Sequence, residues 1–455
     1  MPGPLKPGPS MPASASQLRS FLAAAERAAD PRCALRPHLE QLVRESAESF
    51  HLLAFGKASL EMADEALLVL GARIAGGVVT CVPERLDSLS PDRRGAFDAA
   101  KCELLPADHP LATQRNVAAA MRVGEFVRSL APSGHLLVLI SGGGSAHLTL
   151  PAPELSLEHL RDVTQLLNRA GCDIRELNAV RKHCEQLKGG RLGGMCRARD
   201  VRVLVLSDVL SDGGPDGLVE PLDVISSGPF TPDPTTYSDA LAILEDVDGW
   251  NRAPEIMQHL QRGERGEIPE TPKPGDPSLG SISTTVLGGN RQLVDALADH
   301  AASLNLPVVA KWYDTSGDAD DIAERIVAFV CSQPAAAAPR ALIVGGEWTV
   351  SVGESSGTGG PSQHLALALA IGFAGTTAGA LVYSSDGIDG PTDGAGAIVD
   401  GNTMSAAIGA GLDPRTSLAN RDSHSLFAVL HAKGASHLRP GPTGTNVNHV
   451  AVVLF

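Results

Sequence analysis

The chain has 455 residues, and its 37 Lys plus Arg stand against 52 Asp plus Glu, which gives a formal net charge of −15 at pH 7. Hydrophobic residues make up 43% of the chain, which is enough for a core and excludes global disorder. The acidic balance argues against a nucleic-acid-binding protein, but a small anionic ligand stays compatible with it because such a site depends on local charge.

The seven cysteines are scattered and form no C-x-x-C pair, which predicts reduced thiols in a cytoplasmic protein rather than disulfides or a zinc site. No apolar run approaches the ~18 residues of a membrane span, so no membrane association is expected. Residues 1–16 are rich in Pro, Ser and Gly, and we interpret them as a flexible tail.

After this tail, apolar runs of strand length alternate with segments of helical spacing. In chain order, the predicted elements are helices 17–29 and 38–49, strand 51–55, helix 58–70, strand 77–81, helix 113–130, strand 135–140, helix 155–170, strand 201–206, strand 284–287, helix 290–302, strand 308–312, helix 319–331, strand 341–344, helix 363–371 and strands 380–384 and 449–454. Apolar strands separated by helices predict an α/β fold with a parallel sheet covered on both faces. Ligands are then expected beyond the carboxyl ends of the strands.

The length predicts two or three domains, or one large domain with an appendage. Residues 264–280 lose the periodicity, and Pro, Glu and Gly dominate there, which indicates a linker or a long surface loop. The predicted division is therefore an N-terminal α/β domain at 17–265, a linker or loop at 266–281, and a smaller C-terminal α/β domain at 282–455.

The first candidate site residue is Lys57, which follows strand 51–55 in the sequence FGKAS. A cation at the start of a helix can meet an anionic ligand, because the free N–H groups of the helix also favour anions. A solvated loop lysine is the alternative interpretation.

The second candidate is the segment Ser141-Gly142-Gly143-Gly144-Ser145, directly after strand 135–140. Without Cβ atoms such a turn can point successive N–H groups at one anion, and the two serines add donors. The segment therefore predicts a phosphate-binding loop, with an ordinary glycine-rich turn as the alternative. Neither a G-x-x-x-x-G-K-[ST] loop nor a G-x-G-x-x-G dinucleotide fingerprint occurs in the chain.

Charged residues supply further candidates. Arg181 and Lys182 add local positive charge that can bind a carboxylate or phosphate, although a solvated basic helix face explains them equally well. Asp208 follows strand 201–206, where a carboxylate commonly serves as a base, a Mg²⁺ ligand or simply a helix cap. A hydroxyl residue, Ser211, and a second acidic residue, Asp212, follow shortly after it.

A second acidic candidate is the stretch SSDGIDGPTDG after strand 380–384, which contains Asp386, Asp389 and Asp393. Three carboxylates among Gly and Pro predict a Mg²⁺–phosphate site or a catalytic base. A surface turn in which the aspartates cap neighbouring backbone groups is the alternative.

Taken together, the motifs resemble those of a known family. In order along the chain they are FGKAS, ADHPLAT, LVLISGGGSAHLTLP, LNAVRKHCEQLKGGRLG, VLVLSDVLSDG, ISSGPFTPDPTT, GGNRQLVDALADHA, SSDGIDGPTDGAGAIVDG and GPTGTNVNHV. This set is similar to that of the class II glycerate kinases, whose C-terminal part contains the MOFRL domain. The resemblance implies a Rossmann-like N-terminal domain with a parallel sheet, a smaller C-terminal α/β (MOFRL) domain, and an active site in the cleft between the two.

The implied activity is that of a phosphotransferase with an alcohol group as acceptor, which converts D-glycerate and ATP to 2-phosphoglycerate and ADP with Mg²⁺. Small molecules are the implied partners, and a homodimer is compatible with the family. Because members are often labelled hydroxypyruvate reductases, an NAD(P)H-dependent reductase is one alternative. A non-catalytic anion-binding homologue is the other.

The resemblance also implies roles for the candidate residues. Lys57, Asp208 and Asp386 are the expected catalytic residues, with one aspartate as base and the other organising Mg²⁺. The expected binding residues for substrate or nucleotide are Ser141, Gly142, Gly143, Gly144, Ser145, Arg181, Lys182 and Asn290, with Arg181 pairing with the glycerate carboxylate. Asp386 and Asp393 are the expected metal ligands.

The chain departs from the family pattern at one stretch, GTGGPSQH, where the family usually has G-R-G-G-R-N-Q-E or G-R-G-G-P-N-Q-E. Thr358 stands where Arg is expected, Pro361 where Arg is common, and His364 replaces an acidic residue. Arg181, Lys182 and Arg291 are the candidates to replace the missing positive charge. Without such compensation, an altered substrate preference or a weakened activity is expected.

Overall fold

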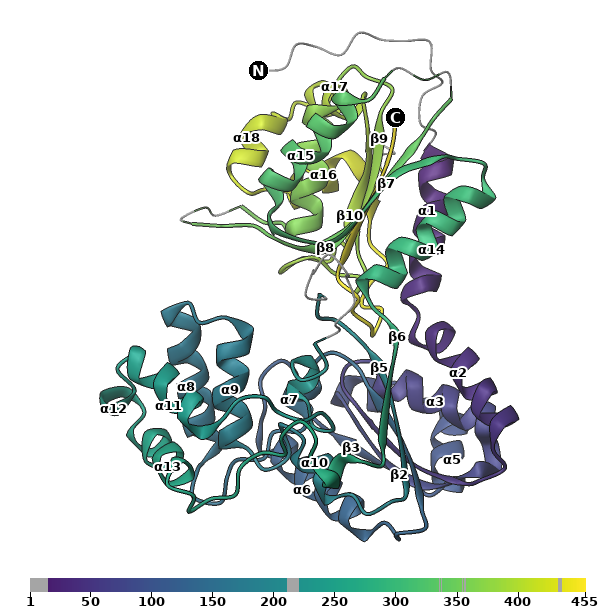
Figure 1. Cartoon of the computed structure of the whole chain (residues 1–455). Coiled ribbons are helices and arrows are strands. Elements are labelled where there is room, and N and C mark those ends of the chain that lie inside the picture. Colours follow the sequence, from purple (N-terminus) through teal and green to yellow (C-terminus); the bar gives the residue numbers. More distant parts are fainter. Residues whose placement is uncertain are drawn as a thin grey trace. The chain divides into compact units, whose positions relative to one another are not determined.

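The computed structural model describes residues 15–210, 221–334, 336, 338–353, 355, 357–432 and 436–455 (Figure 1). Most of the predicted tail, together with Ser211 and Asp212, lies outside the described residues. The chain folds into two compact units, one with residues 34–209 and 221–287 and the other with residues 15–33 and 288–455. Each unit has its own sheet and its own apolar core.

The first unit contains a six-stranded sheet in the order β3-β2-β1-β4-β5-β6. Its strands are β1 (Phe50–Phe55), β2 (Ile74–Cys81), β3 (Cys102–Pro106), β4 (His135–Ile140), β5 (Asp200–Leu206) and β6 (Ile282–Gly288). β1 pairs in parallel with β2 and β4, β2 with β3, and β4 with β5, which confirms the predicted parallel sheet. In doubly wound folds with this 3-2-1-4-5-6 order, ligands bind where the order reverses, which is between β1 and β4.

Helices cover this sheet and form a separate cluster beside it (Figure 1). The helices are α2 (Pro31–Glu45), α3 (Ser59–Leu70), α4 (Pro83–Asp87), α5 (Pro91–Ala99), α6 (Gln114–Ser129), α7 (Gly144–His147), α8 (Leu157–Ala170), α9 (Ile174–Cys184), α10 (Arg191–Met195), α11 (Tyr237–Asp246), α12 (Gly249–Arg252) and α13 (Pro254–Glu264), with the 3₁₀ turns η1 (Gly71–Arg73), η2 (Ile225–Ser227) and η3 (Pro277–Leu279). α3 packs on β1 and β2, whereas α8, α9, α11 and α13 pack around their own apolar core, which includes Val163, Leu167 and Leu260.

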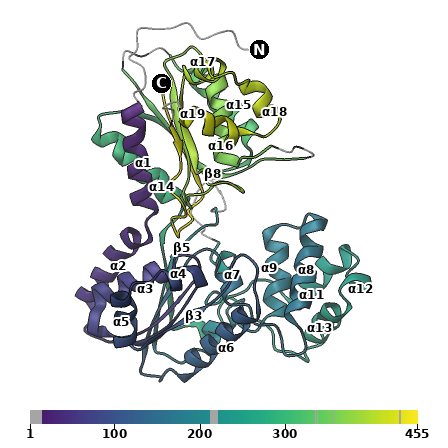
Figure 2. The same cartoon turned by 180° about the vertical axis from the view of Figure 1, so that it is seen from behind.

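The second unit contains a mixed sheet in the order β11-β10-β9-β12-β8-β7. Its elements are β7 (Val308–Asp318), β8 (Ala341–Thr349), β9 (Gly379–Ser384), β10 (Gly396–Asp400), β11 (Ser436–Leu438), β12 (His449–Leu454), α1 (Ala15–Ala29), α14 (Asn290–Ser303), α15 (Ala319–Ser332), α16 (Pro361–Gly372), α17 (Thr403–Gly409), α18 (Pro414–Ala419) and α19 (Ser423–His431). Only β7 and β8 pair in parallel, and the other pairs of the sheet are antiparallel. α1 and α14 lie together beside the sheet, and α15 and α16 lie on its other face (Figures 1 and 2).

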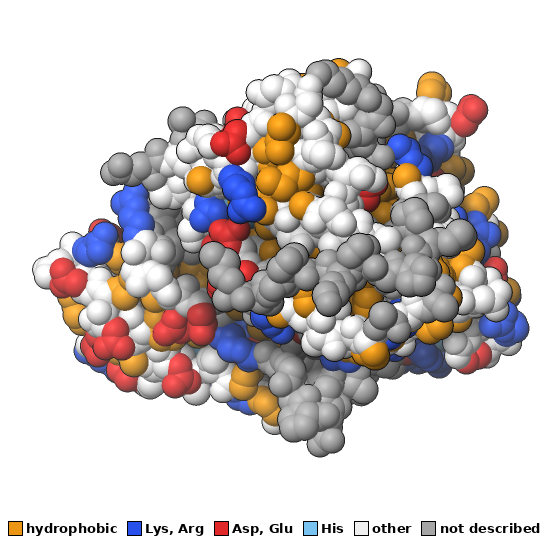
Figure 3. All heavy atoms as spheres, turned by 90° about the horizontal axis from the view of Figure 1, so that it is seen from above, with side chains coloured by type: hydrophobic (Ala, Val, Ile, Leu, Met, Phe, Trp, Pro, Cys, Tyr) orange, Lys and Arg blue, Asp and Glu red, His pale blue; other side chains and the backbone are white. Residues whose placement is uncertain are grey.

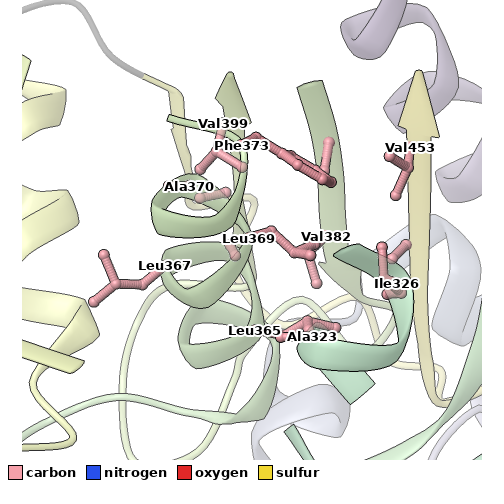
Figure 4. Close-up of a cluster of buried hydrophobic side chains, with 14 of the residues drawn as sticks. Ala323, Ile326, Leu365, Leu367, Leu369, Ala370, Phe373, Val382, Val399 and Val453 are labelled. Carbon is pink, nitrogen blue, oxygen red and sulfur yellow. The ribbon is translucent and has the colours of Figure 1, made fainter. Parts of the chain in front are cut away.

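α16 lies at the centre of the core of this second unit (Figure 4). Leu365, Leu369 and Phe373 are fully buried and pack with Val382 of β9 and Ile326 of α15. The helix carries apolar residues on nearly every side, which is typical of a helix enclosed by other elements. Because this helix is rigidly packed, the loops at its amino end have a fixed support.

The compact units differ from the division drawn on the sequence. α1 belongs to the second unit, where Leu18 and Phe21 are buried and the helix packs on α14 and β9. Residues 266–281 and β6 belong to the first unit, where Thr271 is buried and β6 completes the sheet. The amphipathic pattern of a helix predicts that it packs against a core but does not say which one.

Within the described residues, no helix has the length and apolar character that crossing a membrane requires. All seven cysteines are present as free thiols. Basic and acidic side chains are interspersed on the face shown in Figure 3.

Candidate functional site

Two loops meet at the carboxyl ends of β1 and β4, the predicted position for a ligand. The two strands pair in register up to their last residues. The Lys57 backbone N–H donates to Gly142 O at 2.8 Å, and the Ala58 N–H donates to Ser141 Oγ at 2.9 Å. The FGKAS and SGGGS segments, which are far apart in the sequence, are therefore joined directly by hydrogen bonds.

Three side chains crowd the glycines of this loop so closely that no side chain fits there. A Cβ at Gly142 would lie 1.9 Å from Asp208 Oδ2. A Cβ at Gly143, whose φ is +82°, would lie 2.8 Å from His109 Cδ2 and 3.1 Å from Lys57 Cγ. The structure thus brings the predicted residues Lys57 and Asp208 to the glycine loop and adds His109, which our sequence reasoning did not single out.

The backbone N–H groups of the loop are available to a ligand. In the described part of the chain, the N–H groups of Gly142, Gly143, Gly144 and Ser145 donate to no acceptor. Successive unpaired N–H groups in a turn form a concave site suited to an anion. This geometry is the one that the sequence predicts for phosphate oxygens.

Burial and the charge of Lys57 set the protonation of the neighbouring groups. Burial raises the pKa of Asp208, and the Lys57 ammonium opposes this shift. Burial and the same ammonium lower the pKa of His109 to about 4, so the imidazole is neutral at pH 7. A carboxylate with a raised pKa is a stronger proton acceptor, which suits a general base.

Lys188 supports the loop from its buried side. Its side chain is fully buried, and Nζ donates to Ser145 O at 2.9 Å and to Glu185 Oε2 at 2.6 Å. A helix as short as α7 does not stabilise itself, so a cation bound to its carbonyl oxygens supports it. Burial lowers the pKa of Lys188 to about 8, and the Glu185 carboxylate opposes the shift.

Ser226 and Ser227 hold the loop from the η2 turn. Both have a positive φ, +53° and +59°, which is unfavourable for a residue with a side chain. This conformation lets Ser226 Oγ donate to Ser141 O at 3.3 Å and places Ser227 Oγ 2.8 Å from Ser145 Oγ. The strained turn therefore contacts both ends of the glycine loop.

The two basic candidates on α9 point in different directions. Lys182 is buried, and its Nζ contacts Asp223 at 3.0 Å and Asp233 at 3.3 Å, so it neutralises internal carboxylates rather than facing the loop. Arg181 is half-buried, with Nε 3.9 Å from Glu185 Oε1.

Arg181 lines a cavity of about 540 Å³ in the first unit. Thr113, Thr149 and Glu185 line the same cavity, and so does Ala146 of α7. The cavity therefore reaches the segment that follows the glycine loop, and Arg181 gives it a guanidinium that suits a carboxylate.

In the second unit, the three carboxylates of the acidic loop after β9 have different surroundings and contacts. Asp386 Oδ1 accepts from Ser384 Oγ at 3.0 Å and from the Ile388 N–H at 3.3 Å, and its side chain is half-buried. Asp393 is largely exposed and lies 3.4 Å from His424 Nε2 and 3.5 Å from Arg439 Nη1. No cluster of three or more metal-ligating side chains occurs in the described ranges, so the predicted pair of Asp386 and Asp393 is not part of a preformed metal cage.

Asp389, the middle carboxylate, caps the amino end of α16. It is buried and accepts from the backbone N–H groups of Ser362 at 3.0 Å and Gln363 at 2.8 Å. Burial raises its pKa to about 6, and the two hydrogen bonds oppose the shift. For this carboxylate the structure favours the alternative of a helix cap.

The stretch that departs from the family pattern has its own internal partners. His364 is buried, with Nε2 2.9 Å from Asp320 Oδ1 and 2.9 Å from Arg421 Nη1. Arg421 also contacts Asp320 Oδ2 at 2.6 Å. An arginine from a distant part of the sequence therefore reaches the first turns of α16, although Thr358 and Pro361 carry no charge.

Two further predicted residues have structural contacts at the start of α14. Asn290 Nδ2 donates to Val447 O at 3.0 Å and to His449 O at 2.9 Å, which ties α14 to the segment leading into β12. Arg291 Nη2 contacts Asp314 at 2.9 Å. Of the three proposed replacement cations, Arg181 thus has the longest carboxylate contact, 3.9 Å from Glu185.

Comparison with known proteins identifies the family. The model described as "Domain of unknown function (DUF4147)" matches residues 17–261, and the MOFRL family model matches residues 340–449. The glycerate 2-kinase of Pyrococcus horikoshii is 33% identical over 417 residues, which cover 89% of this chain and 87% of that protein. The D-glycerate 2-kinase of Thermotoga maritima is 35% identical over 429 residues, which cover 91% of this chain and 93% of that protein.

A solved structure agrees with these matches. The crystal structure of glycerate kinase from Thermotoga maritima superposes with a TM-score of 0.82 at 32% identity and covers 97% of this chain and 99% of that one. The resemblance inferred from the ordered motifs is therefore confirmed, and so is the α/β fold class. The chain belongs to the family of glycerate 2-kinases with a MOFRL domain.

Proposed function

We propose that this chain is a glycerate 2-kinase that transfers the γ-phosphoryl group of ATP to the 2-hydroxyl of D-glycerate. The observation that carries the proposal is the convergence of Lys57 and Asp208 on a glycine loop at the β1–β4 switch point. Four N–H groups of this loop donate to no acceptor among the residues that the structure describes. Phosphoryl transfer needs mainly positioning and neutralisation of charge, which this arrangement supplies.

Each group near the loop has a distinct task in the proposed reaction. The loop N–H groups bind phosphate oxygens, and the Lys57 ammonium stabilises the charge that builds up on the transferred phosphoryl group. Asp208 accepts the proton of the reacting hydroxyl, because burial raises its pKa and so makes it a stronger base. Asp386 is the alternative base, and Arg181 binds the glycerate carboxylate.

The donor set fits a Mg²⁺ ion that arrives with the nucleotide better than a resident ion. Mg²⁺ is usually held by one or two carboxylates together with substrate phosphates. Asp386, which is half-buried at the end of β9, fits this role, whereas Asp393 already lies near the side chains of His424 and Arg439. When bound, Mg²⁺ neutralises the phosphate oxygens.

The homodimer and the cytoplasmic location stay predictions.

Replacement of Lys57 tests the proposal at its centre. In Lys57→Ala the phosphoryl group loses its nearest cation, and we expect kcat for ADP release with D-glycerate and MgATP to fall at least ~10²- to 10³-fold. Lys101→Asn is a matched control, because Lys101 is exposed and its φ of +55° is one that asparagine tolerates. Near wild-type turnover in Lys57→Ala would contradict the role of Lys57.

A further inference from the structure

Behind the glycine loop, a chain of buried polar groups determines which group donates and which accepts in each hydrogen bond. On α9, Asn178 Nδ2 lies 3.5 Å from Val224 O, and a carbonyl oxygen only accepts hydrogen bonds. The amide NH₂ of Asn178 therefore faces Val224, and its Oδ1 faces Ser227 Oγ at 2.8 Å. Since Oδ1 also only accepts, Ser227 donates its hydroxyl proton to Asn178.

The donor role of Ser227 also determines where the hydroxyl proton of Ser145 points. Ser145 Oγ lies 2.8 Å from Ser227 Oγ, and a serine hydroxyl has a single proton to donate. Because the proton of Ser227 is used on Asn178, Ser145 donates to Ser227. Asn178 and Ser227 are buried, whereas Ser145 is half-buried, so a ligand that reaches Ser145 meets its lone pairs and not its proton.

The two serines of the loop thus offer opposite chemistry. Ser141 Oγ is buried and accepts from the Ala58 N–H, so its own proton is not used in that bond. Ser145 Oγ offers only an acceptor, which repels a phosphate oxygen and suits a hydroxyl group. The chain from Ser145 to Val224 contains no titratable group, so it cannot take up a proton. A hydroxyl bound to Ser145 therefore keeps its proton throughout the reaction.

We infer that Ser145 binds the hydroxyl of D-glycerate that is not phosphorylated, the 3-hydroxyl, by accepting a hydrogen bond from it. Ser227 and Asn178 are positioning residues that hold Ser145 in the accepting orientation. The identity of the substrate in this inference rests on the proposed function. The consequence is a preference for acids that have a 3-hydroxyl over acids that lack it.

D-lactate is the matched probe, because it differs from D-glycerate by the absence of the 3-hydroxyl. We expect calorimetric titration of the wild type, with a non-hydrolysable MgATP analogue present, to show D-glycerate binding about 2- to 10-fold more tightly than D-lactate. In Ser145→Ala this ratio should fall to about 1, with the affinity for D-lactate changed by less than about 2-fold.

Two more variants separate substrate binding from a structural effect. Ser227→Ala should reduce the ratio in the same direction, because it frees the proton of Ser145. Ser129→Ala should leave the ratio unchanged, because Ser129 is exposed on α6 and donates only to Phe126 O.

Four outcomes would overturn the inference. In the wild type, this outcome is equal or undetectable binding of the two acids. In Ser145→Ala, these outcomes are an unchanged ratio of the two affinities, an equal loss of affinity for both acids, and an effect confined to the Mg²⁺ dependence of binding. The titration needs no turnover. It is therefore read separately from the ADP-release assay, whose failure in the wild type would instead contradict the proposed function.

Discussion

At the scale of single residues, the loop that holds Lys57 depends on a histidine kept neutral by burial. His147 Nδ1 accepts from the Gly56 N–H at 3.2 Å and lies 3.0 Å from Thr80 Oγ1. Because Nδ1 accepts, the ring proton is on Nε2. Burial and, to a smaller extent, the nearby His109 lower the pKa of His147 to about 3.

The depressed pKa of His147 predicts a pH dependence of stability. Between the ordinary histidine pKa of about 6.5 and the folded value of about 3, the unfolded chain binds a proton that the folded chain does not. The contribution of neutral His147 to stability is therefore present above about pH 6.5 and is lost as the pH falls. From pH 7 to pH 5 this residue alone should cost ~2 kcal/mol of the free energy of unfolding.

His147→Asn checks this expectation, since asparagine Oδ1 can accept at the place of Nδ1 and does not titrate. Urea unfolding at pH 7 and pH 5 should show a smaller loss of stability in the variant than in the wild type. His431→Asn, at an exposed position of α19, should behave like the wild type. Equal losses in all three proteins would rule out His147 as the source.

At the level of residues, prediction from the sequence succeeded where a motif follows a buried strand. It failed where the role of a residue depends on which way its side chain points. Lys57 and the glycine loop were predicted together because both follow apolar strands. Arg181 and Lys182 look alike in the sequence, but neighbouring helical residues point about 100° apart, and only one reaches the cavity. Lys188 and His109 reach the loop through tertiary contacts that no local pattern encodes.

At the scale of elements, the acidic loop after β9 supports α16 through one carboxylate. In Asp389→Ala the backbone N–H groups of Ser362 and Gln363 lose their acceptor in a buried place. We expect the free energy of unfolding to fall by about 1–2 kcal/mol, as for the loss of a helix cap. Urea unfolding at pH 7 measures this loss.

Asp393→Ala is the matched comparison within the same loop. Asp393 is 67% exposed, and its contacts with His424 and Arg439 are long, so its removal should change stability by less than about 0.5 kcal/mol. Similar losses in the two variants would show that Asp389 is not the structural cap.

The elements themselves were only partly readable from the sequence. Long apolar runs predicted β1, β4, β5 and β12, whereas the shorter strands β3, β10 and β11 escaped prediction. The apolar runs of β9 and β12 also predicted strands but not their antiparallel pairing, because burial on both faces gives the same pattern in either direction.

At the scale of the whole molecule, a chain with a net charge of −15 presents the cation of Lys57 at the glycine loop, where an anionic substrate is proposed to bind. Lys182 and Lys188 are buried against carboxylates, whereas Lys57 makes no ion pair with any residue that the structure describes. Its side chain lies against Gly143 of the glycine loop, and its charge lowers the pKa of the neighbouring Asp208 and His109.

The central claim is the transfer of phosphate to the 2-hydroxyl of glycerate, and the identity of the product tests it most directly. We expect the purified chain, incubated with D-glycerate and MgATP, to release ADP and to form 2-phosphoglycerate. In proton-coupled ³¹P NMR this ester appears as a doublet, because its phosphorus couples to the single proton on C2. A triplet from 3-phosphoglycerate, or oxidation of NADH by hydroxypyruvate without ADP release, would contradict the account.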